Sequence, residues 1–261
     1  MVLMTGKNKE NQVYQAERNM HARSVILPLI REEQTFSACA AIVRGELATG
    51  APWAGQLHPE EKAAYDAFPS TRRKESFLLG RLSARQAVLG LTGIDTPHAI
   101  WIDTGVFQFP VVRGAGLRNI QVSISHCDNI GFSVAFPEAH PLGVDVEKVG
   151  GETEEAVLSQ LTGKEKMLLR SCGQDHTAGY TAVFSMKEAL SKILRTGMML
   201  DFQFLEVEEV KVLKGALACT FTHFGQYKAF ARFQKPHVFS MALPRRTAVH
   251  PAPLWRLLEE G

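Results

Sequence analysis

The chain has 261 residues, of which 45% are hydrophobic and 21% are charged, and its formal net charge is +2. This composition predicts a folded globular protein, built as one large domain or as two modest ones in contact. The small positive charge argues against a nucleic-acid partner, because binding to a phosphate backbone normally needs a concentrated basic surface.

The four cysteines, Cys39, Cys127, Cys172 and Cys219, are well separated in the sequence. Their spacing forms neither a C-x-x-C metal motif nor a dense disulfide framework, and it favours reduced thiols. No apolar run approaches the roughly 20 residues that cross a bilayer, and the N-terminal stretch is polar where a signal peptide would be apolar. We therefore predict a cytoplasmic protein with no membrane partner.

The first half of the chain is predicted to follow a flexible leader at residues 1–20, which is polar and has no apolar period. A helical stretch is expected from His58 to about Leu89. Strands are expected at SVILPLI, FSACAAIV, IQVSISH, GFSVAF and PLGVDVEKV. The last three strands would form a meander that brings Ser125–His126 and Asp145–Glu147 into one sheet.

The second half is predicted to begin with helices and to close with strands. Helices are expected at about 152–160, 164–170 and 178–195, and strands at 204–213, 216–221, 227–233 and 238–243. Both halves therefore show helix followed by strands, a pattern compatible with an α+β fold of two similar halves. We place the boundary near His140–Pro141, which gives an N-terminal half at 21–140 and a C-terminal half at 141–261.

The segment GVDVEK carries two carboxylates, Asp145 and Glu147, two residues apart. In a strand such residues point to the same face, while Val144 and Val146 turn into the core. Two like charges side by side repel unless a cation compensates them, and oxygen ligands of this kind suit Mg²⁺ or Mn²⁺. An edge strand with two solvated acids is the alternative interpretation.

The longest helix of the second half contains FSMKEALSKIL. Its apolar residues recur at helical spacing, and Lys187, Glu188 and Lys192 are predicted to lie on another face. Glu188 and Lys192 are four residues apart, a spacing that is typical of a simple helix-stabilising ion pair. Their meaning therefore depends on what the fold places beside them.

Basic residues gather on the first helical stretch, where Arg81 and Arg85 follow Arg72, Arg73 and Lys74. Arg81 and Arg85 are four residues apart, so they project from nearly one face of a helix. A solvated charged face is the ordinary explanation of this pattern, and a phosphate-binding surface is the alternative.

His126 follows a strand and can be a general base, a phosphate contact or an ordinary surface histidine. A Ser-His or Cys-His nucleophile is not expected, because Ser125, His126 and Cys127 are sequence neighbours and consecutive strand residues point to opposite faces. The sequence contains no G-x-S-x-G, P-loop or complete G-x-G-x-x-G motif. These absences argue against the commonest hydrolases, NTPases and dinucleotide-binding proteins.

Taken in order, FLLGRLSARQAV, FPVV, SISH, GVDVEK and FSMKEALSK resemble the Sfp-type 4′-phosphopantetheinyl transferases, in particular the branch of the enterobactin synthetase D component. The resemblance covers about residues 58–200. It implies a pseudo-twofold fold with coenzyme A in a cleft between the halves and Mg²⁺, or Mn²⁺, on its pyrophosphate. The implied activity moves 4′-phosphopantetheine from coenzyme A to a serine of an acyl or peptidyl carrier protein and releases adenosine 3′,5′-bisphosphate.

The resemblance also implies residue roles. Asp145, Glu147 and Glu188 would be the metal ligands, Glu188 and Lys192 the catalytic pair, and Lys192 a contact of the pyrophosphate. Arg73, Arg81 and His126 are candidates for the 3′-phosphate. The predicted coenzyme-binding set is Arg73, Arg81, Arg85, Ser125, His126, Lys187 and Lys192.

Two other functions explain part of the same pattern. A metal-dependent phosphohydrolase or nuclease would use the same three carboxylates, and a catalytically silent module would only bind a carrier protein. We expect the partner to be a carrier domain of a nonribosomal peptide, polyketide or fatty-acid-type synthase, as in secondary metabolite biosynthesis. A chain with both halves of the cleft needs no second subunit, so we predict a monomer.

Overall fold

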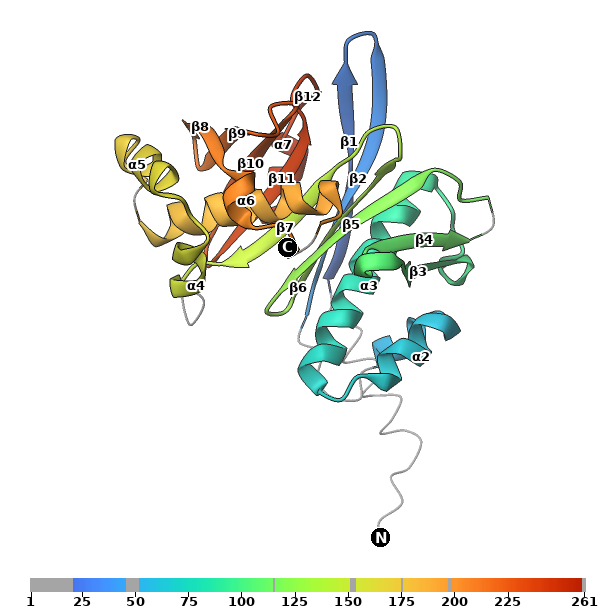
Figure 1. Cartoon of the computed structure of the whole chain (residues 1–261). Coiled ribbons are helices and arrows are strands. Elements are labelled where there is room, and N and C mark those ends of the chain that lie inside the picture. Colours follow the sequence, from blue (N-terminus) through green and yellow to red (C-terminus); the bar gives the residue numbers. More distant parts are fainter. Residues whose placement is uncertain are drawn as a thin grey trace.

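The computed structural model describes residues 21–45, 52–114, 116–150, 154–174, 176–196 and 199–259. The predicted leader at residues 1–20 lies outside this part of the chain. Two five-stranded antiparallel sheets dominate the structure (Figure 1). A separate ribbon pairs β3 (Ile100–Thr104) with β4 (Pro110–Gly114).

The two sheets divide the chain between them. The first sheet has the order β12-β1-β2-β6-β5 and the second has the order β7-β11-β10-β9-β8. The first contains β1 (His21–Arg31), β2 (Gln34–Arg44), β5 (Ile120–Cys127), β6 (Ile130–Pro137) and β12 (Ala248–Val249). The second contains β7 (Gly143–Lys148), β8 (Val207–Leu213), β9 (Ala216–Phe221), β10 (Tyr227–Gln234) and β11 (His237–Pro244).

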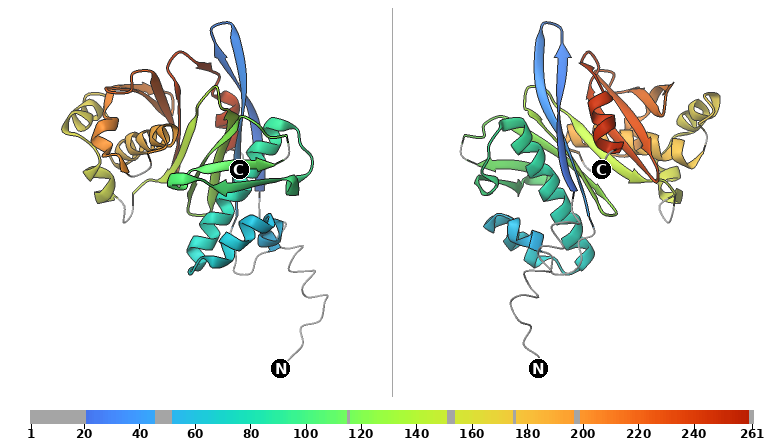
Figure 2. Two further views of the ribbon diagram at one scale, coloured as in Figure 1. Left: turned by 45° about the vertical axis from the view of Figure 1, so that its right-hand side comes forward. Right: turned by 180° about the vertical axis from the view of Figure 1, so that it is seen from behind.

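One long helix packs on each sheet, α3 on the first and α6 on the second (Figure 1, Figure 2). The α-helices are α2 (Pro59–Ala67), α3 (Thr71–Thr92), α4 (Glu154–Ser159), α5 (Gly163–Ser171), α6 (Thr177–Leu194) and α7 (Ala252–Glu259). Short 3₁₀ segments are η1 (Pro52–Gln56), η2 (Pro97–Ala99), η3 (Val106–Gln108) and η5 (Phe202–Leu205). The α+β class is confirmed, and no helix in the described ranges is long and apolar enough to cross a membrane.

The first helical stretch is divided into α2 and α3, where the sequence predicts one continuous stretch. Phe68 has extended backbone (ψ 133°), because the following Pro69 disfavours a helical conformation at the residue before it. Ser70 then caps α3 by accepting a hydrogen bond from the Arg73 amide. The helix ends at Gly93, whose φ of 71° lies in the left-handed region that glycine adopts without strain.

The predicted meander of three strands in one sheet is wrong. β5 and β6 pair with each other, but β7 pairs with β11 and forms an edge of the second sheet. β5 and β7 face each other as edge strands, and serine hydroxyls join them. Ser123 Oγ accepts from the Val144 amide at 3.0 Å, and Ser125 Oγ accepts from the Val146 amide at 3.3 Å. We call this junction the seam.

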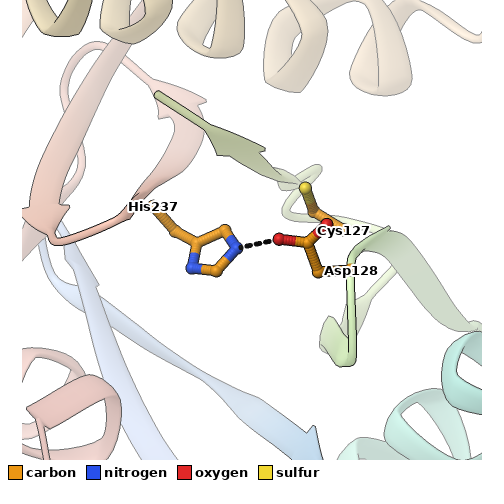
Figure 3. Close-up of side chains that lie close together, drawn as sticks. All are labelled: Cys127, Asp128 and His237. Atoms are coloured by element: carbon orange, nitrogen blue, oxygen red, sulfur yellow. Dashed lines mark hydrogen bonds and ion pairs between the residues drawn. The ribbon is translucent and has the colours of Figure 1, made fainter. Parts of the chain in front are cut away.

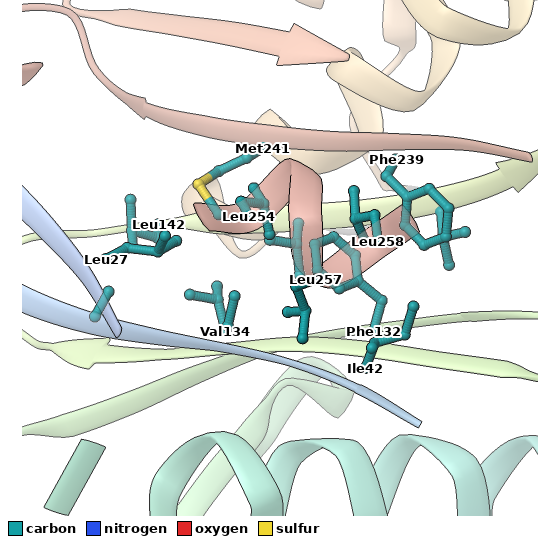
Figure 4. Packing of buried hydrophobic residues seen from close by; sticks show 14 of the residues in the cluster. Leu27, Ile42, Phe132, Val134, Leu142, Phe239, Met241, Leu254, Leu257 and Leu258 are labelled. Carbon is teal, nitrogen blue, oxygen red and sulfur yellow. The ribbon is translucent and has the colours of Figure 1, made fainter. Parts of the chain in front are cut away.

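The C-terminal helix α7 lies in the hydrophobic core between the two sheets (Figure 4). Leu254, Leu257 and Leu258 point into this core at helical spacing, beside Phe132 of the first sheet and Phe239 of the second. Helix α7 is not among the elements expected from the sequence, although PAPLWRLLEE has an apolar stripe and a proline near its start. This helix therefore helps to hold the halves together by burying apolar surface.

Gly143 lets β7 approach α6 closely. A Cβ atom at this position would lie 1.9 Å from the carbonyl oxygen of Ala189, which is backbone and cannot rotate away. We expect Gly143→Ala to lower the free energy of unfolding by about 1–3 kcal/mol through overpacking. Chemical denaturation measures this. Gly163→Ala is the control, because its Cβ has no atom within 4 Å, and equal effects of the two changes would contradict the packing argument.

His140 lies at the predicted boundary, fully buried, with Nε2 2.7 Å from Thr247 Oγ1 and its ring 5.2 Å from Phe36. Burial lowers the pKa of this imidazole, and Arg31 lowers it further. Below its usual pKa of about 6.5, the unfolded chain therefore binds a proton that the folded chain does not.

We expect the free energy of unfolding to fall as pH drops below about 6.5, with a contribution from His140 of up to about 1.4 kcal/mol per pH unit. Urea denaturation across this range, for the parent and for His140→Gln, measures the contribution. The variant should show a shallower loss with acid. Identical slopes would show that His140 is not the group responsible.

Candidate active site at the seam

Asp145 is the central residue of the seam. Its side chain is only 3% exposed, and both carboxylate oxygens accept hydrogen bonds. Ser125 Oγ donates to Oδ1 at 2.8 Å, Ser185 Oγ donates to Oδ2 at 2.8 Å, and Lys192 Nζ donates to Oδ1 at 2.8 Å. A buried carboxylate is costly unless it is paired and hydrogen-bonded, and here β5 and α6 supply every donor.

Helix α6 supplies the partners of β7 from one face. Ser185, Glu188 and Lys192 are separated by three and four residues, so they follow one another along the same side of the helix. Lys192 Nζ also donates to the carbonyl of Val144 at 2.9 Å, which fixes the end of α6 to β7. Among the described residues, Lys192 thus pairs with the distant Asp145, and the ordinary helix-stabilising pair with Glu188 is not formed.

The carboxylates of Glu147 and Glu188 are half-buried beside Asp145. Burial and the charges of Asp145 and Glu188 raise the pKa of Glu147 to about 8, against the opposing effect of Lys192. Burial and Asp145 likewise raise the pKa of Glu188, while Lys192 and a hydrogen bond from Ser191 lower it. The site thus holds more acidic groups than its own cation neutralises, which favours binding of an added cation.

The donor set suits a hard divalent ion, because Asp145, Glu147 and Glu188 offer only carboxylate oxygens. Among the described residues, however, these three do not form a group whose ligand atoms all lie within 4.8 Å of one another. The side chains would have to move together to share one ion. The structure brings the three carboxylates to one place but does not place them in a ligand arrangement.

A pocket of about 600 Å³ opens beside the acidic groups. Glu147 and Glu188 line one part of it, and an apolar wall is formed by Val157, Phe184, Leu200 and Phe202. Gln160 and Gln203 add polar groups. The pocket therefore combines an apolar wall with an acidic end.

His126 lies at the exposed end of β5, next to this network. Desolvation and the Lys192 ammonium lower the pKa of its imidazole, while Asp145 raises it. The neighbouring thiol of Cys127 has a pKa raised to about 12 by burial, by Glu147 and by Asp128. Cys127 is therefore protonated at neutral pH, in agreement with the expectation that it is not a nucleophile.

Two residues predicted to contact the coenzyme, Arg85 and Lys187, have buried side chains. The Lys187 ammonium is fully buried and donates to both oxygens of Glu165 at 3.0 Å and to the Gln160 carbonyl at 2.9 Å. The Arg85 guanidinium is 5% exposed and donates to Glu61 and to the Gln56 carbonyl. Each cation is therefore engaged by a buried glutamate, and Arg85 Nε has no hydrogen-bond partner.

The two buried pairs have the same construction in the two halves. Glu61 accepts from the His58 amide at the start of α2 and from the amide of Ile102 in β3. Glu165 accepts from the Thr162 amide at the start of α5 and from the amide of Val207 in β8. Each glutamate therefore joins a capped short helix, a strand and a cation of the long helix, which supports the prediction of two similar halves.

Arg73 and Arg81 lie away from this network. Arg73 is exposed in the first turn of α3. Arg81 stacks 4.4 Å from the Phe77 ring, donates to Thr104 Oγ1 at 3.1 Å, and lines a pocket of about 230 Å³ with Trp101. Their roles in phosphate binding stay predictions.

Sequence reasoning missed two polar residues at the seam. Ser185 holds the second oxygen of Asp145, and Arg195 follows Lys192 at the end of α6. The Arg195 guanidinium lies 4.7 Å from the Phe109 ring and donates to Gln121 Oε1 at 2.7 Å, across the seam. The spacing of three residues between Lys192 and Arg195 was the only available sign.

Comparison with protein families gives a match of residues 141–242 to the ACPS family, the 4′-phosphopantetheinyl transferase superfamily. The matched segment runs from β7 into β11 and contains Asp145, Glu147, Glu188 and Lys192. No curated protein matches the chain. The family match supports the superfamily assignment for the C-terminal half and does not distinguish between its branches.

Removing the Lys187 ammonium should unfold the protein rather than weaken ligand binding. We expect Lys187→Ala to lower the free energy of unfolding by about 3–5 kcal/mol, because it leaves the Glu165 carboxylate buried without a counter-charge. Lys62→Ala is the control, because its ion pair with Asp66 is exposed and should contribute less than about 1 kcal/mol. Denaturation curves decide, and equal losses would contradict the buried-pair interpretation.

Proposed function

We propose that this protein transfers 4′-phosphopantetheine from coenzyme A to a serine hydroxyl of an acyl or peptidyl carrier protein and releases adenosine 3′,5′-bisphosphate. The observation that carries the proposal is the convergence of Asp145, Glu147, Glu188 and Lys192 at the seam, within the segment that matches the superfamily. The ordered motifs SISH, GVDVEK and FSMKEALSK favour the Sfp-type branch within that superfamily.

Asp145, Glu147 and Glu188 would hold Mg²⁺, and Mn²⁺ offers the same oxygen preference. The fit is supported by the clustering of acidic groups, since burial and the charge of Asp145 raise the pKa of both Glu147 and Glu188. When bound, such an ion neutralises charge on a pyrophosphate group. Ser125 and Ser185 hold the Asp145 carboxylate in place through their hydroxyl donors, so this ligand needs little ordering.

Glu188 is the proposed general base. Its carboxylate lines the pocket, and its pKa is raised toward neutral pH. A general base is most effective when its pKa lies near the working pH. It takes the proton of the carrier serine as the hydroxyl oxygen attacks the phosphorus atom attached to pantetheine. The bond from this phosphorus to the departing adenosine 3′,5′-bisphosphate then breaks.

Lys192 and His126 are proposed to bind the phosphates. The Lys192 ammonium lies beside Asp145 and can place its positive charge on the pyrophosphate as negative charge grows on the departing oxygen. His126 lies next to Ser125 in β5, within electrostatic reach of Lys192 and Asp145, and is proposed as a phosphate contact. Arg195 extends this basic edge across the seam.

The pocket of about 600 Å³ is proposed to receive the pantetheine arm. The arm carries methyl and methylene groups that fit the apolar wall of Phe184, Leu200 and Phe202, and two amides that can bond to Gln160 and Gln203. Its phosphate end would then lie at Glu147 and Glu188. The carrier serine would approach from the open side of the same pocket, and a monomer with both halves of the seam suffices.

The proposal is tested by incubating the protein with coenzyme A, Mg²⁺ and an apo carrier protein and weighing the carrier by mass spectrometry. We expect the mass to rise by one phosphopantetheine group. Glu188→Gln should reduce the rate by about 10²–10⁴-fold, because the base is lost while the shape is kept. Glu208→Gln, at an exposed position away from the seam, should leave the rate unchanged.

Other outcomes of this assay support the rival functions. Release of phosphate or nucleotide with an unmodified carrier would favour a metal-dependent phosphohydrolase. Carrier binding without transfer, unaffected by Glu188→Gln, would favour a silent carrier-binding module. If Glu188→Gln transfers at the full rate, Glu188 is not the general base, and the proposed transfer function still stands.

A further inference from the structure

Cys127, Asp128 and His237 form a cluster of metal-ligating side chains outside the proposed coenzyme site (Figure 3). One ligand atom from each residue lies within 4.8 Å of the other two. Cys127 ends β5 and Asp128 begins the turn to β6, whereas His237 begins β11. The cluster therefore joins the first sheet to the second, and no step of the proposed transfer uses it.

One pair of ligand atoms in the cluster already has nearly the spacing of a tetrahedral metal site. His237 Nε2 lies 3.1 Å from Asp128 Oδ2. Ligand atoms about 2.0–2.2 Å from a tetrahedral ion lie roughly 3.3–3.6 Å from each other, so this pair needs almost no movement. His237 is only 7% exposed, so the fold fixes its ring, whereas the Asp128 side chain is 42% exposed and can adjust to an ion.

The three donors are a thiol, an imidazole and a carboxylate. This mixture is typical of sites for Zn²⁺ and similar transition-metal ions, and it differs from the all-oxygen set at Asp145, Glu147 and Glu188. Three protein ligands leave the fourth tetrahedral position for water. The two sites therefore call for different ions.

We propose that Cys127, Asp128 and His237 bind one Zn²⁺-class ion that ties the β5–β6 turn to β11. Coordination replaces the thiol proton, which leaves to solvent, and no oxidation or reduction is involved. The proposal goes beyond the transfer function and does not depend on it. Because β5 and β11 belong to different sheets, the bound ion would stabilise the contact between the halves.

Lys148 competes with the ion for Asp128. Its Nζ lies 3.1 Å from the same Oδ2 that faces His237. The Lys148 side chain is 52% exposed, so its ammonium can move into water at little cost when a metal ion arrives. Lys148 should therefore weaken metal binding without preventing it.

The test titrates the metal-free full chain with Co²⁺, whose absorption spectrum reports tetrahedral geometry and thiolate ligation. Zn²⁺ is then added to displace the Co²⁺. We expect one equivalent of Co²⁺ to give a thiolate-to-cobalt charge-transfer band that Zn²⁺ removes. Cys127→Ser should abolish the band, and His237→Gln should weaken binding by at least about 10–100-fold. Lys148→Gln should strengthen it, because the competing cation is gone.

Two controls separate this site from the rest of the molecule. Cys172→Ser, a half-buried cysteine on the C-terminal side of α5, should keep the band, and Glu188→Gln should keep it as well. Circular dichroism without metal checks that each variant is folded. If His237→Gln fails to fold, Cys127→Ser and Lys148→Gln still decide.

The proposal is overturned if the parent protein shows no thiolate band, or if Cys127→Ser retains it. Neither result bears on the Mg²⁺-dependent carrier assay, because that assay contains no transition metal. A loss of carrier transfer with an intact cobalt band would instead reject the proposed function alone.

Discussion

The structure depends on one buried carboxylate, that of Asp145, at the junction of two sheets. A charge in this position is tolerated only if every oxygen has a donor, and the donors come from β5 and from two turns of α6. The serine hydroxyls of β5 also accept hydrogen bonds from the backbone amides of β7, so side chains join the edge strands of the two halves. The hydrogen bonds that satisfy the Asp145 carboxylate therefore also hold the two halves in alignment.

Four of the described cations form two pairs with opposite roles. Arg85 and Lys187 point inward from the long helices, and each donates hydrogen bonds to a buried glutamate. The same glutamate caps a short helix and accepts a hydrogen bond from the backbone amide of a strand. Lys192 and Arg195 lie further along α6 and reach the seam. Lys187 points into the core and the next residue, Glu188, points to the pocket, because neighbouring side chains of a helix are about 100° apart around its axis.

The seam and the Cys127 cluster share strand β5 but differ in chemistry, because the seam joins β5 to β7 and the cluster joins the end of β5 to β11. Asp145 and Glu147 alternate with buried valines along β7, whereas Cys127 and Asp128 stand at the end of β5, where the chain turns. The first site offers hard oxygen atoms beside a basic edge, and the second offers sulfur and nitrogen beside a single exposed lysine. The fold thus places two different ligand environments where its halves meet.

The sequence by itself determined most helices and strands, the burial of Val144 and Val146, and the set of carboxylates, because these follow from local periodicity and residue chemistry. Only the tertiary structure decided that β7 leaves the sheet of β5, that Lys187 and Arg85 are core residues, and that Ser185 and Arg195 face the seam. Which strand pairs with β7, and which partner a lysine meets, depends on residues far apart in the chain. Local spacing carries no information about those distant partners, so the buried hydrogen bonds and charges of the folded protein fix them.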